Sequence, residues 1–486
     1  MVNSAETSEP TPRRALLAIL YVTLLAALAV PAIGALYRSP YNWGDGTKAQ
    51  AVLLIAVPSV VLLWSVLSAR HSLAWSIYWT WSLVFLGLAA VYQMSANAFP
   101  WKGVLLEEHI NTAQRIILLA HATVFLVALI ARPSARPGQV NAPPQVQGFG
   151  DKPQLKKLVM LVMSGHILVA ALFCALMGPT LFTGRLAFQS RLVGMDGLPG
   201  FGSMYFLSNA GAIIIPAMVI LLRKSRLDIP KFGIFLSIAV SFLATNPLIG
   251  SRFLTGSFLV AVVAASVGAY ARRWIPFGTI AAFVTLFPTL DLLRGDGTGA
   301  TQIELTPPDE TLTTFDYDSF EMLVREVSVQ GNLPGGLPSS LELLIAPFLR
   351  WIPVLSQTVL GDASGPVVAK SSGMTFTNVS MPLWGESHLI GSWAGVVIAF
   401  CLFGLLLART TGAGNGQSIF GPLIETPTAA LLFIILRGSL YEVLGYLLLA
   451  AAIALAFANA ERRDRLGIGI NKPWTDPYPA MLHRGQ

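Results

Sequence analysis

The residues of this chain that could do chemistry gather in one long polar stretch, residues 294–388, and beside it. Glu386 and His388 close this stretch, just before an apolar run. A carboxylate or an imidazole there can take a proton from a hydroxyl group near neutral pH. We predict both as candidate catalytic bases at the mouth of a helix, whose dipole would also favour an anionic substrate. The alternative is that Glu386 only caps that helix and His388 has no chemical role.

A second group of candidates consists of arginines near the predicted outer boundary of the membrane. They are Arg185, Arg191, Arg252, Arg294 and Arg350. A guanidinium group offers a planar fork of N–H donors to phosphate oxygens, and it stays charged in poorly hydrated places. We predict that they bind a lipid diphosphate, with Arg191, Arg252 and Arg350 meeting in one outward-facing cavity. The alternative for each one is a side chain that only reaches toward water or lipid phosphate.

Two acids in the long stretch complete the candidate substrate-binding residues. Asp316 and Asp318 open the segment Phe315–Val324, which has the pattern of a short amphipathic helix. Either carboxylate can cap this helix, and its apolar face is expected to lie on the membrane surface. The alternative is a capped interfacial helix without a catalytic role.

Metal and thiol chemistry have no sequence signature in this chain. Neither an HExxH nor a paired CxxC motif occurs, and Cys174 and Cys401 both lie inside apolar runs. His121 and His166 also lie inside apolar runs, and we interpret them as polar contacts between helices. We therefore expect no metal and no cofactor.

The elements that must position these residues are membrane-spanning helices. Hydrophobic residues make up 54% of the 486 residues and charged residues only 12%. Apolar runs near twenty residues recur, and each can cross a bilayer of about 30 Å. The sequence predicts an all-α polytopic membrane protein of about twelve transmembrane helices, with a large extracytoplasmic loop before the tenth. The spans are centred on 15–36, 49–68, 72–94, 114–131, 158–178, 204–222, 232–249, 253–271, 274–292, 389–408, 418–436 and 439–459.

Charge sets the predicted orientation of these helices. Basic residues concentrate in alternate connections, which places both termini in the cytoplasm. The formal net charge of +7 is explained by this topology and not by nucleic-acid binding. The first span is expected to remain as an anchor. The predicted units are a first transmembrane block (1–293, with a cytoplasmic linker at 133–156), the loop (294–388), three last helices (389–460) and a cytoplasmic tail (461–486).

Five segments resemble the bacterial oligosaccharide repeat-unit polymerases, the Wzy-type O-antigen polymerases of surface polysaccharide synthesis. Gly250–Arg252 is similar to the family's arginine at the head of a mid-chain helix. Phe315–Phe320 and Leu349–Pro353 resemble the acidic and "R-x-I-P" pieces of its outer loop. Pro382–Glu386 followed by Gly391–Val396 is similar to the block that closes that loop.

The resemblance implies a GT-C-like helical core and a metal-independent, inverting glycosyl transfer. A growing glycan would pass from its undecaprenyl diphosphate carrier to the sugar of the next lipid-linked repeat unit, at the outer face of a bacterial inner membrane. The implied partners are undecaprenyl-diphosphate-linked oligosaccharides and the bilayer, with a chain-length regulator and a flippase as candidate protein partners. Nucleic acid is not expected.

Three alternatives remain at this point. An O-antigen ligase is less favoured because His388 alone does not reproduce the histidine-rich loop of those enzymes. A twelve-helix secondary transporter or exporter usually buries its charges near the bilayer midplane, whereas the ionisable residues here gather at the outer boundary. A membrane subunit without an activity of its own is the third alternative.

Overall fold

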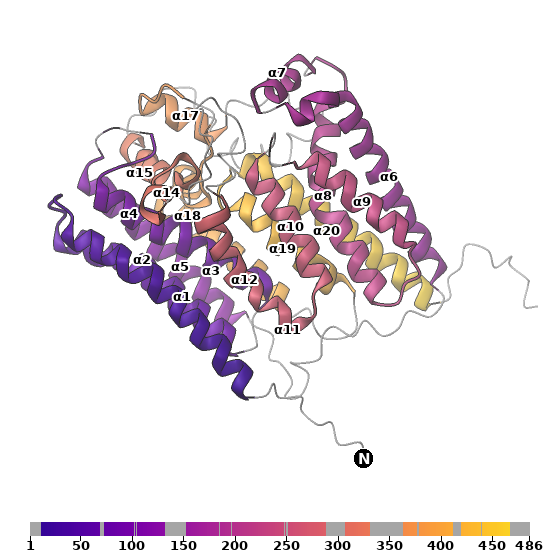
Figure 1. Cartoon of the computed structure of the whole chain (residues 1–486), viewed down its shortest axis with the longest axis horizontal. Coiled ribbons are helices and arrows are strands. Elements are labelled where there is room, and N and C mark those ends of the chain that lie inside the picture. Colours follow the sequence, from indigo (N-terminus) through magenta and orange to yellow (C-terminus); the bar gives the residue numbers. More distant parts are fainter. Residues whose placement is uncertain are drawn as a thin grey trace, which may run out of the picture.

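The computed structural model is helical throughout the part of the chain that it describes. It describes residues 11–68, 72–101, 103, 105–131, 152–183, 185–195, 197–246, 248, 251–287, 307–330, 363–376, 379–411, 419–438 and 440–466. No β-strand occurs in these ranges. Figure 1 shows the helices running side by side as one bundle, with short helices across one end.

The first half of the bundle is built on a central helix that is completely enclosed. It consists of α3 (Leu73–Trp81), the π-helical segment η1 (Ser82–Leu88) and α4 (Ala89–Ala96). The most apolar stretch of this central helix is buried in its entirety. Its neighbours are α1 (Thr11–Arg38), α2 (Asp45–Ser68), α5 (Glu107–Ile130) and α19 (Phe420–Ile435).

The second half contains the remaining long helices. These are α6 (Pro153–Met177), α8 (Phe201–Lys224), α9 (Lys231–Ala244), α10 (Arg252–Ser266) and α20 (Leu440–Arg465), with the short η2 (Gly178–Phe182), α7 (Arg185–Met195), α11 (Ala269–Arg272), α12 (Trp274–Ala281) and η3 (Ala282–Leu286). Helix α19 packs on α3, α8, α10 and α20, and so connects the two halves.

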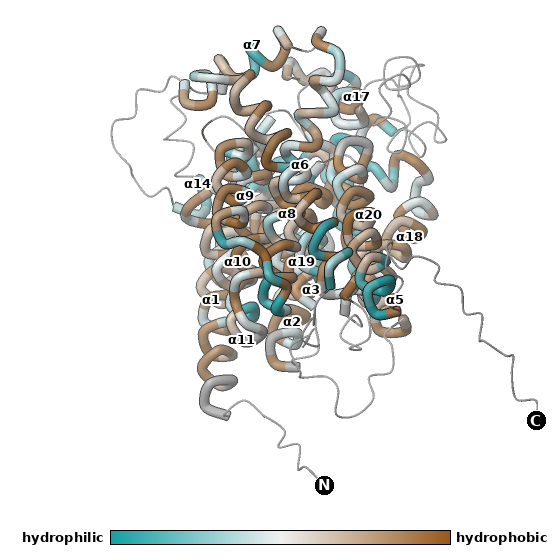
Figure 2. Tube along the Cα trace, turned by 90° about the vertical axis from the view of Figure 1, so that its right-hand side faces the viewer, coloured by the Kyte–Doolittle hydropathy of each residue, from teal (hydrophilic) through white to brown (hydrophobic). Residues whose placement is uncertain are grey.

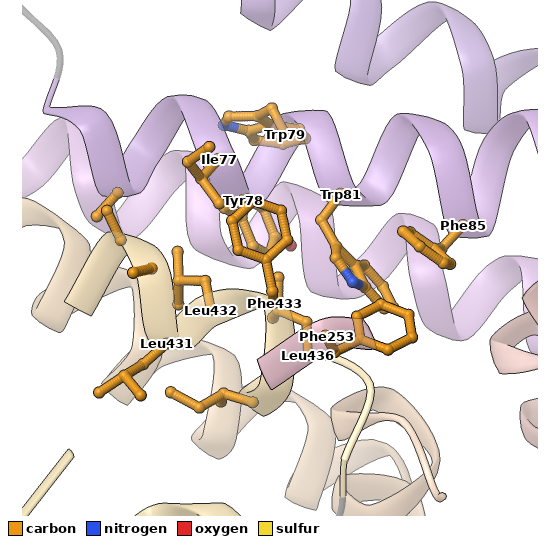
Figure 3. Close-up of a cluster of buried hydrophobic side chains, with 14 of the residues drawn as sticks. Ile77, Tyr78, Trp79, Trp81, Phe85, Phe253, Leu431, Leu432, Phe433 and Leu436 are labelled. Atoms are coloured by element: carbon orange, nitrogen blue, oxygen red, sulfur yellow. The ribbon is translucent and has the colours of Figure 1, made fainter. Parts of the chain in front are cut away.

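Aromatic side chains fill the contact between the halves. Trp81 of α3 stacks on Trp384, with ring centroids 5.4 Å apart and an interplanar angle of 7°. Figure 3 shows Trp81 and Phe85 beside Phe253 of α10 and Phe433 of α19. Large rigid rings bury much apolar area at little entropic cost, which explains why sequence-distant helices meet here.

The predicted all-helical class is confirmed for the described residues, whereas the predicted number of twelve spans is not confirmed. Eight helices of the described residues are long and apolar enough to cross a membrane. Four shorter apolar helices, Lys231–Ala244, Arg252–Ser266, Trp274–Leu286 and Leu423–Ile435, coincide with the other four predicted spans. Figure 2 shows the long helices coloured mostly hydrophobic along their length.

The residues of the predicted loop that the structure describes lie across one end of the bundle, which we call the loop end. They form α14 (Pro308–Thr311), η4 (Phe315–Tyr317), α15 (Ser319–Val329) and α17 (Ser364–Ser371), and the chain then enters α18 (Leu383–Thr411). Helix α7 lies at the same end as α15 and α17, and α11 lies at the opposite end (Figure 1).

Helices α6 and α20 are joined at that opposite end. The Asp464 carboxylate accepts the backbone N–H groups of Gln154 (3.2 Å) and Leu155 (2.9 Å), the free donors of the first turn of α6. Lys152 pairs with Glu461 of α20 at 2.6 Å. The last turn of one helix therefore caps the first turn of another.

Several predicted boundaries differ from those of the observed helices. Helix α6 begins at Pro153, inside the predicted linker, because proline is tolerated in a first turn. Helix α18 begins at Leu383 and α20 continues to Arg465. Glu386 therefore lies in the first turn of α18, and His388 lies in the next turn.

Candidate functional site

Helix α15 organises the loop end. Its residues Ser319–Glu326 are all buried, because the helix packs against α4, α5, α17, α18 and η1. We had predicted an amphipathic helix on the membrane surface, and that prediction is wrong. The polar face of α15 points into protein, where its charged residues pair with one another or with groups from elsewhere in the chain.

The first of these contacts fixes a carboxylate in the first turn of α15. Glu321 pairs with Arg325 one turn later at 2.6 Å and accepts the backbone N–H of Trp101 at 2.9 Å. Burial raises the pKa of Glu321, and the Arg325 guanidinium acts in the opposite direction. These bonds attach the connection after α4 to α15.

The second contact is a four-membered charge cluster at the start of α15. Arg252, the first residue of α10, forms a buried ion pair with Asp316. Arg437 approaches the same carboxylate at 4.0 Å and Asp318 at 3.4 Å. Trp101 donates its indole N–H to Asp318 at 3.1 Å. Burial raises the pKa of Asp318, and Arg437 opposes this shift.

Asp318 occupies the N-cap position of α15, but its side chain makes no capping hydrogen bond. The predicted capping role is therefore wrong for Asp318. Its carboxylate is used instead by Arg437 and Trp101. Asp316 lies in the single turn of η4 before the helix and faces the arginines.

The third contact is a histidine–carboxylate pair. His388 Nδ1 lies 3.0 and 3.1 Å from the two carboxylate oxygens of Glu326, and both side chains are buried. Burial raises the pKa of Glu326, and the bond to His388 lowers it. A carboxylate that accepts from Nδ1–H leaves the other ring nitrogen, Nε2, as a proton acceptor. Nε2 has no hydrogen-bond partner among the described residues.

Glu386 is held in a different way, although it lies only two residues from His388. It is 2% exposed, and Ser364 of α17 donates its hydroxyl to the carboxylate at 3.0 Å. The other oxygen accepts the backbone N–H of Leu440, the first residue of α20. The carboxylate thus joins the starts of three helices, α17, α18 and α20.

A strained break follows these residues within α18. Gly391 and Ser392 leave the helical conformation, and Ser392 has φ 51° and ψ −144°. This region is populated almost only by glycine and costs on the order of 1–3 kcal/mol for other residues. The Trp393 ring, directly after the break, contacts the His388 ring edge to face at 5.7 Å.

The structure brings some predicted site residues together and not others. Arg252, Asp316 and Asp318 belong to one cluster, whereas Arg191 is exposed on α7 and donates a hydrogen bond to the Leu176 carbonyl at 3.4 Å. The side chain of Arg185 lies outside the described residues, as do Arg294 and Arg350. The predicted meeting of Arg191, Arg252 and Arg350 therefore stays a prediction.

Two residues of the site were missed in the sequence analysis. Arg437 lies between the last two helices, on the same predicted outer side as Arg252, and this position was a signal for it. Glu326 lies just beyond the segment that we had predicted as helical. Only the position of His388 in three dimensions identifies its role.

Acid–base chemistry and anion binding are what this arrangement can support. Among the described residues, no group of three or more His, Cys, Asp and Glu side chains is placed to hold a metal ion. Comparison of the chain with known protein families, with characterised proteins and with solved structures gives no match. The function is therefore argued from the site.

Proposed function

We propose that this protein is a glycosyltransferase that polymerises undecaprenyl-diphosphate-linked oligosaccharide repeat units into a surface polysaccharide. The observation that carries the proposal is the loop end itself, where buried arginines and a histidine–carboxylate pair lie under α15 and α17. In this proposal the loop end faces the outer side of a bacterial inner membrane and receives the substrate head groups.

The chemistry needs a base for the acceptor sugar and cations for the departing diphosphate. We assign the base to His388, whose Nε2 takes the proton of the attacking hydroxyl. The hydroxyl oxygen forms a bond to the anomeric carbon, and the bond from that carbon to the diphosphate oxygen breaks. The carrier diphosphate leaves with that electron pair, and Arg252 offsets its charge.

Glu326 acts through His388 in this proposal. It accepts the Nδ1–H, which leaves the lone pair of the neutral imidazole on Nε2, and it stabilises the imidazolium that forms during transfer. It is a positioning residue because it does not touch the substrate. Glu386 is assigned an anchoring role, since both of its oxygens accept hydrogen bonds from protein groups.

The test is chain growth by the purified protein in liposomes that contain lipid-linked repeat units. We expect His388→Gln to lower turnover on the order of 10²–10⁴-fold. Glu326→Gln should cost less and change the pH profile of turnover, and Glu326→Asp should restore part of it. The matched control is His109→Gln, because the His109 side chain is 25% exposed and lies outside the site.

Two results would contradict this assignment. Normal turnover by the His388→Gln variant would show that His388 is not the base. Movement of lipid-linked units across the bilayer without chain growth by the wild-type protein would indicate a transporter or flippase instead.

A further inference from the structure

Two arginines from different parts of the chain meet at one carboxylate. Arg252 faces Oδ2 of Asp316, and Arg437 faces Oδ1 at 4.0 Å. Each oxygen of the carboxylate thus has a guanidinium group of its own. Phosphate groups in other proteins are bound in the same way, by guanidinium groups placed around one small anion.

The two guanidinium groups are held in place without Asp316. Arg252 lies over the Phe287 ring at 4.8 Å and donates to the Phe287 carbonyl at 2.7 Å. Arg437 lies over the Phe253 ring at 4.3 Å. The two rings contact each other, with centroids 4.9 Å apart. A ring face is attractive to a cation, so this aromatic floor fixes both groups side by side.

Arg437 has a donor that its neighbouring acceptors do not use. It pairs with Asp318 at 3.4 Å, lies 4.0 Å from Asp316 and donates to the Phe315 carbonyl at 3.3 Å. Its Nε atom is nevertheless buried and has no hydrogen-bond partner among the described residues. A diphosphate would bring more oxygens and more negative charge to the same place.

The Asp316 side chain lies at the partly exposed edge of the cluster. It belongs to the single three-residue turn η4, and it is 15% exposed. The turn itself is held by Tyr317, which is buried and donates its hydroxyl to the Phe283 carbonyl. Rotation of the Asp316 side chain, without movement of the turn, would bring the carboxylate into water, where its charge is solvated, and would open the arginines to a ligand.

We infer that Arg252 and Arg437 form a binding site for a diphosphate group and that Asp316 occupies it as an internal anion that the ligand displaces. The identification of the ligand as a lipid diphosphate rests on the proposed function. The anion site itself rests only on the geometry. Asp316 is then a competitor of the substrate and not one of its contacts.

The experiment measures binding of inorganic pyrophosphate to the full-length protein in detergent, by calorimetry and by the shift in melting temperature. Asp316→Asn removes the competing charge, and we expect affinity to rise about tenfold or more. Arg437→Gln in the same chain should cancel the gain. The matched control is Glu461→Gln, which removes a buried negative charge that pairs with Lys152 at the opposite end of the bundle. It should change the affinity less than about twofold to threefold.

Loss of the carboxylate also leaves two buried cations less well paired, so the Asp316→Asn variant is expected to melt earlier. Pyrophosphate should then restore its melting temperature, and should do so less in the Arg437→Gln background. Unchanged or weaker binding by Asp316→Asn, or a loss of stability that pyrophosphate does not restore, would overturn the inference.

A second arm replaces pyrophosphate with farnesyl diphosphate, which carries the same head group on a short lipid. Tighter binding of the lipid form assigns the site to a lipid carrier, and equal binding assigns it to the free anion. If pyrophosphate binds as expected but purified protein makes no polymer, the proposed function fails and the anion site stands.

Discussion

Replacing Glu386 separates an anchoring carboxylate from a catalytic one. In Glu386→Gln, the amide oxygen can accept the Leu440 N–H and the amide nitrogen can donate to the Ser364 hydroxyl, which then acts as the acceptor. Both hydrogen bonds survive, but each becomes a bond between neutral groups. Charge-assisted bonds are about twice as strong as neutral ones, so we expect a loss of about 1–2 kcal/mol in the free energy of unfolding.

Glu386→Ala removes both acceptors. It leaves the Leu440 N–H and the Ser364 hydroxyl buried beside a small cavity. An unsatisfied buried group costs about 1–3 kcal/mol, so the total should reach about 3–5 kcal/mol. The two variants should therefore differ in stability by a clear margin, and the Gln variant should keep near-normal turnover for each folded molecule.

The assay compares chain growth with the amount of folded protein, and it measures unfolding in mixed micelles. Glu108→Gln is the control, because the Glu108 side chain is 75% exposed. A fall of 10²-fold or more in turnover by Glu386→Gln at unchanged stability would refute the anchoring role and return the base to Glu386.

Three further outcomes follow from the loop end. Ser392→Gly should stabilise the protein by about 1 kcal/mol net, since the relief of strain exceeds the added backbone entropy, whereas Ser392→Ala should not; thermal unfolding of both variants checks this. Gly395→Ala should destabilise by about 2 kcal/mol or more, because its new Cβ would lie 2.3 Å from the Ser387 carbonyl oxygen. Burial raises the pKa of Glu326 in the folded protein above its ordinary value of 4.5. At a pH between these two pKa values, the folded protein keeps a proton on Glu326 that the unfolded chain has lost. Stability should fall as pH rises through this window, and less so in Glu326→Gln; unfolding measured as a function of pH checks the sign, and a rise in stability would contradict it.

Hydropathy was sufficient to locate the helices in the sequence, but it did not show where the residues of the loop lie in the structure. Each predicted span falls on an observed helix, because a long apolar run has few alternatives in a bilayer. Helix α15 was placed on the membrane surface because its sequence pattern has an apolar face. In the structure its residues Glu321, Arg325 and Glu326 are paired with one another, with Trp101 and with His388. Such pairing joins residues far apart in the chain, and no local pattern reveals it.

The sequence identified several residues of the candidate site, but it predicted their arrangement only in part. Arg252 was expected near the outer boundary of the membrane as a ligand of a diphosphate, and in the structure it is buried and paired with Asp316. Glu386 was weighed as a base or as a cap for its own helix, and its carboxylate instead accepts the first N–H of α20. The difference arises because the backbone N–H groups at the start of a helix can donate to any nearby acceptor, whichever segment of the chain carries it.

The bond between Asp464 and the start of α6 also has a consequence in time. The paired residues Lys152 and Glu461 are 309 positions apart. At about 5–20 residues per second, the ribosome delivers α20 roughly 15–60 s after α6 has emerged. During that interval the backbone N–H groups in the first turn of α6 must donate to other acceptors, from chaperones, lipid head groups or water. Assembly of this bundle therefore ends where the late helix reaches back to the early one, and substitutions at Asp464 should act on biogenesis before they act on any finished molecule.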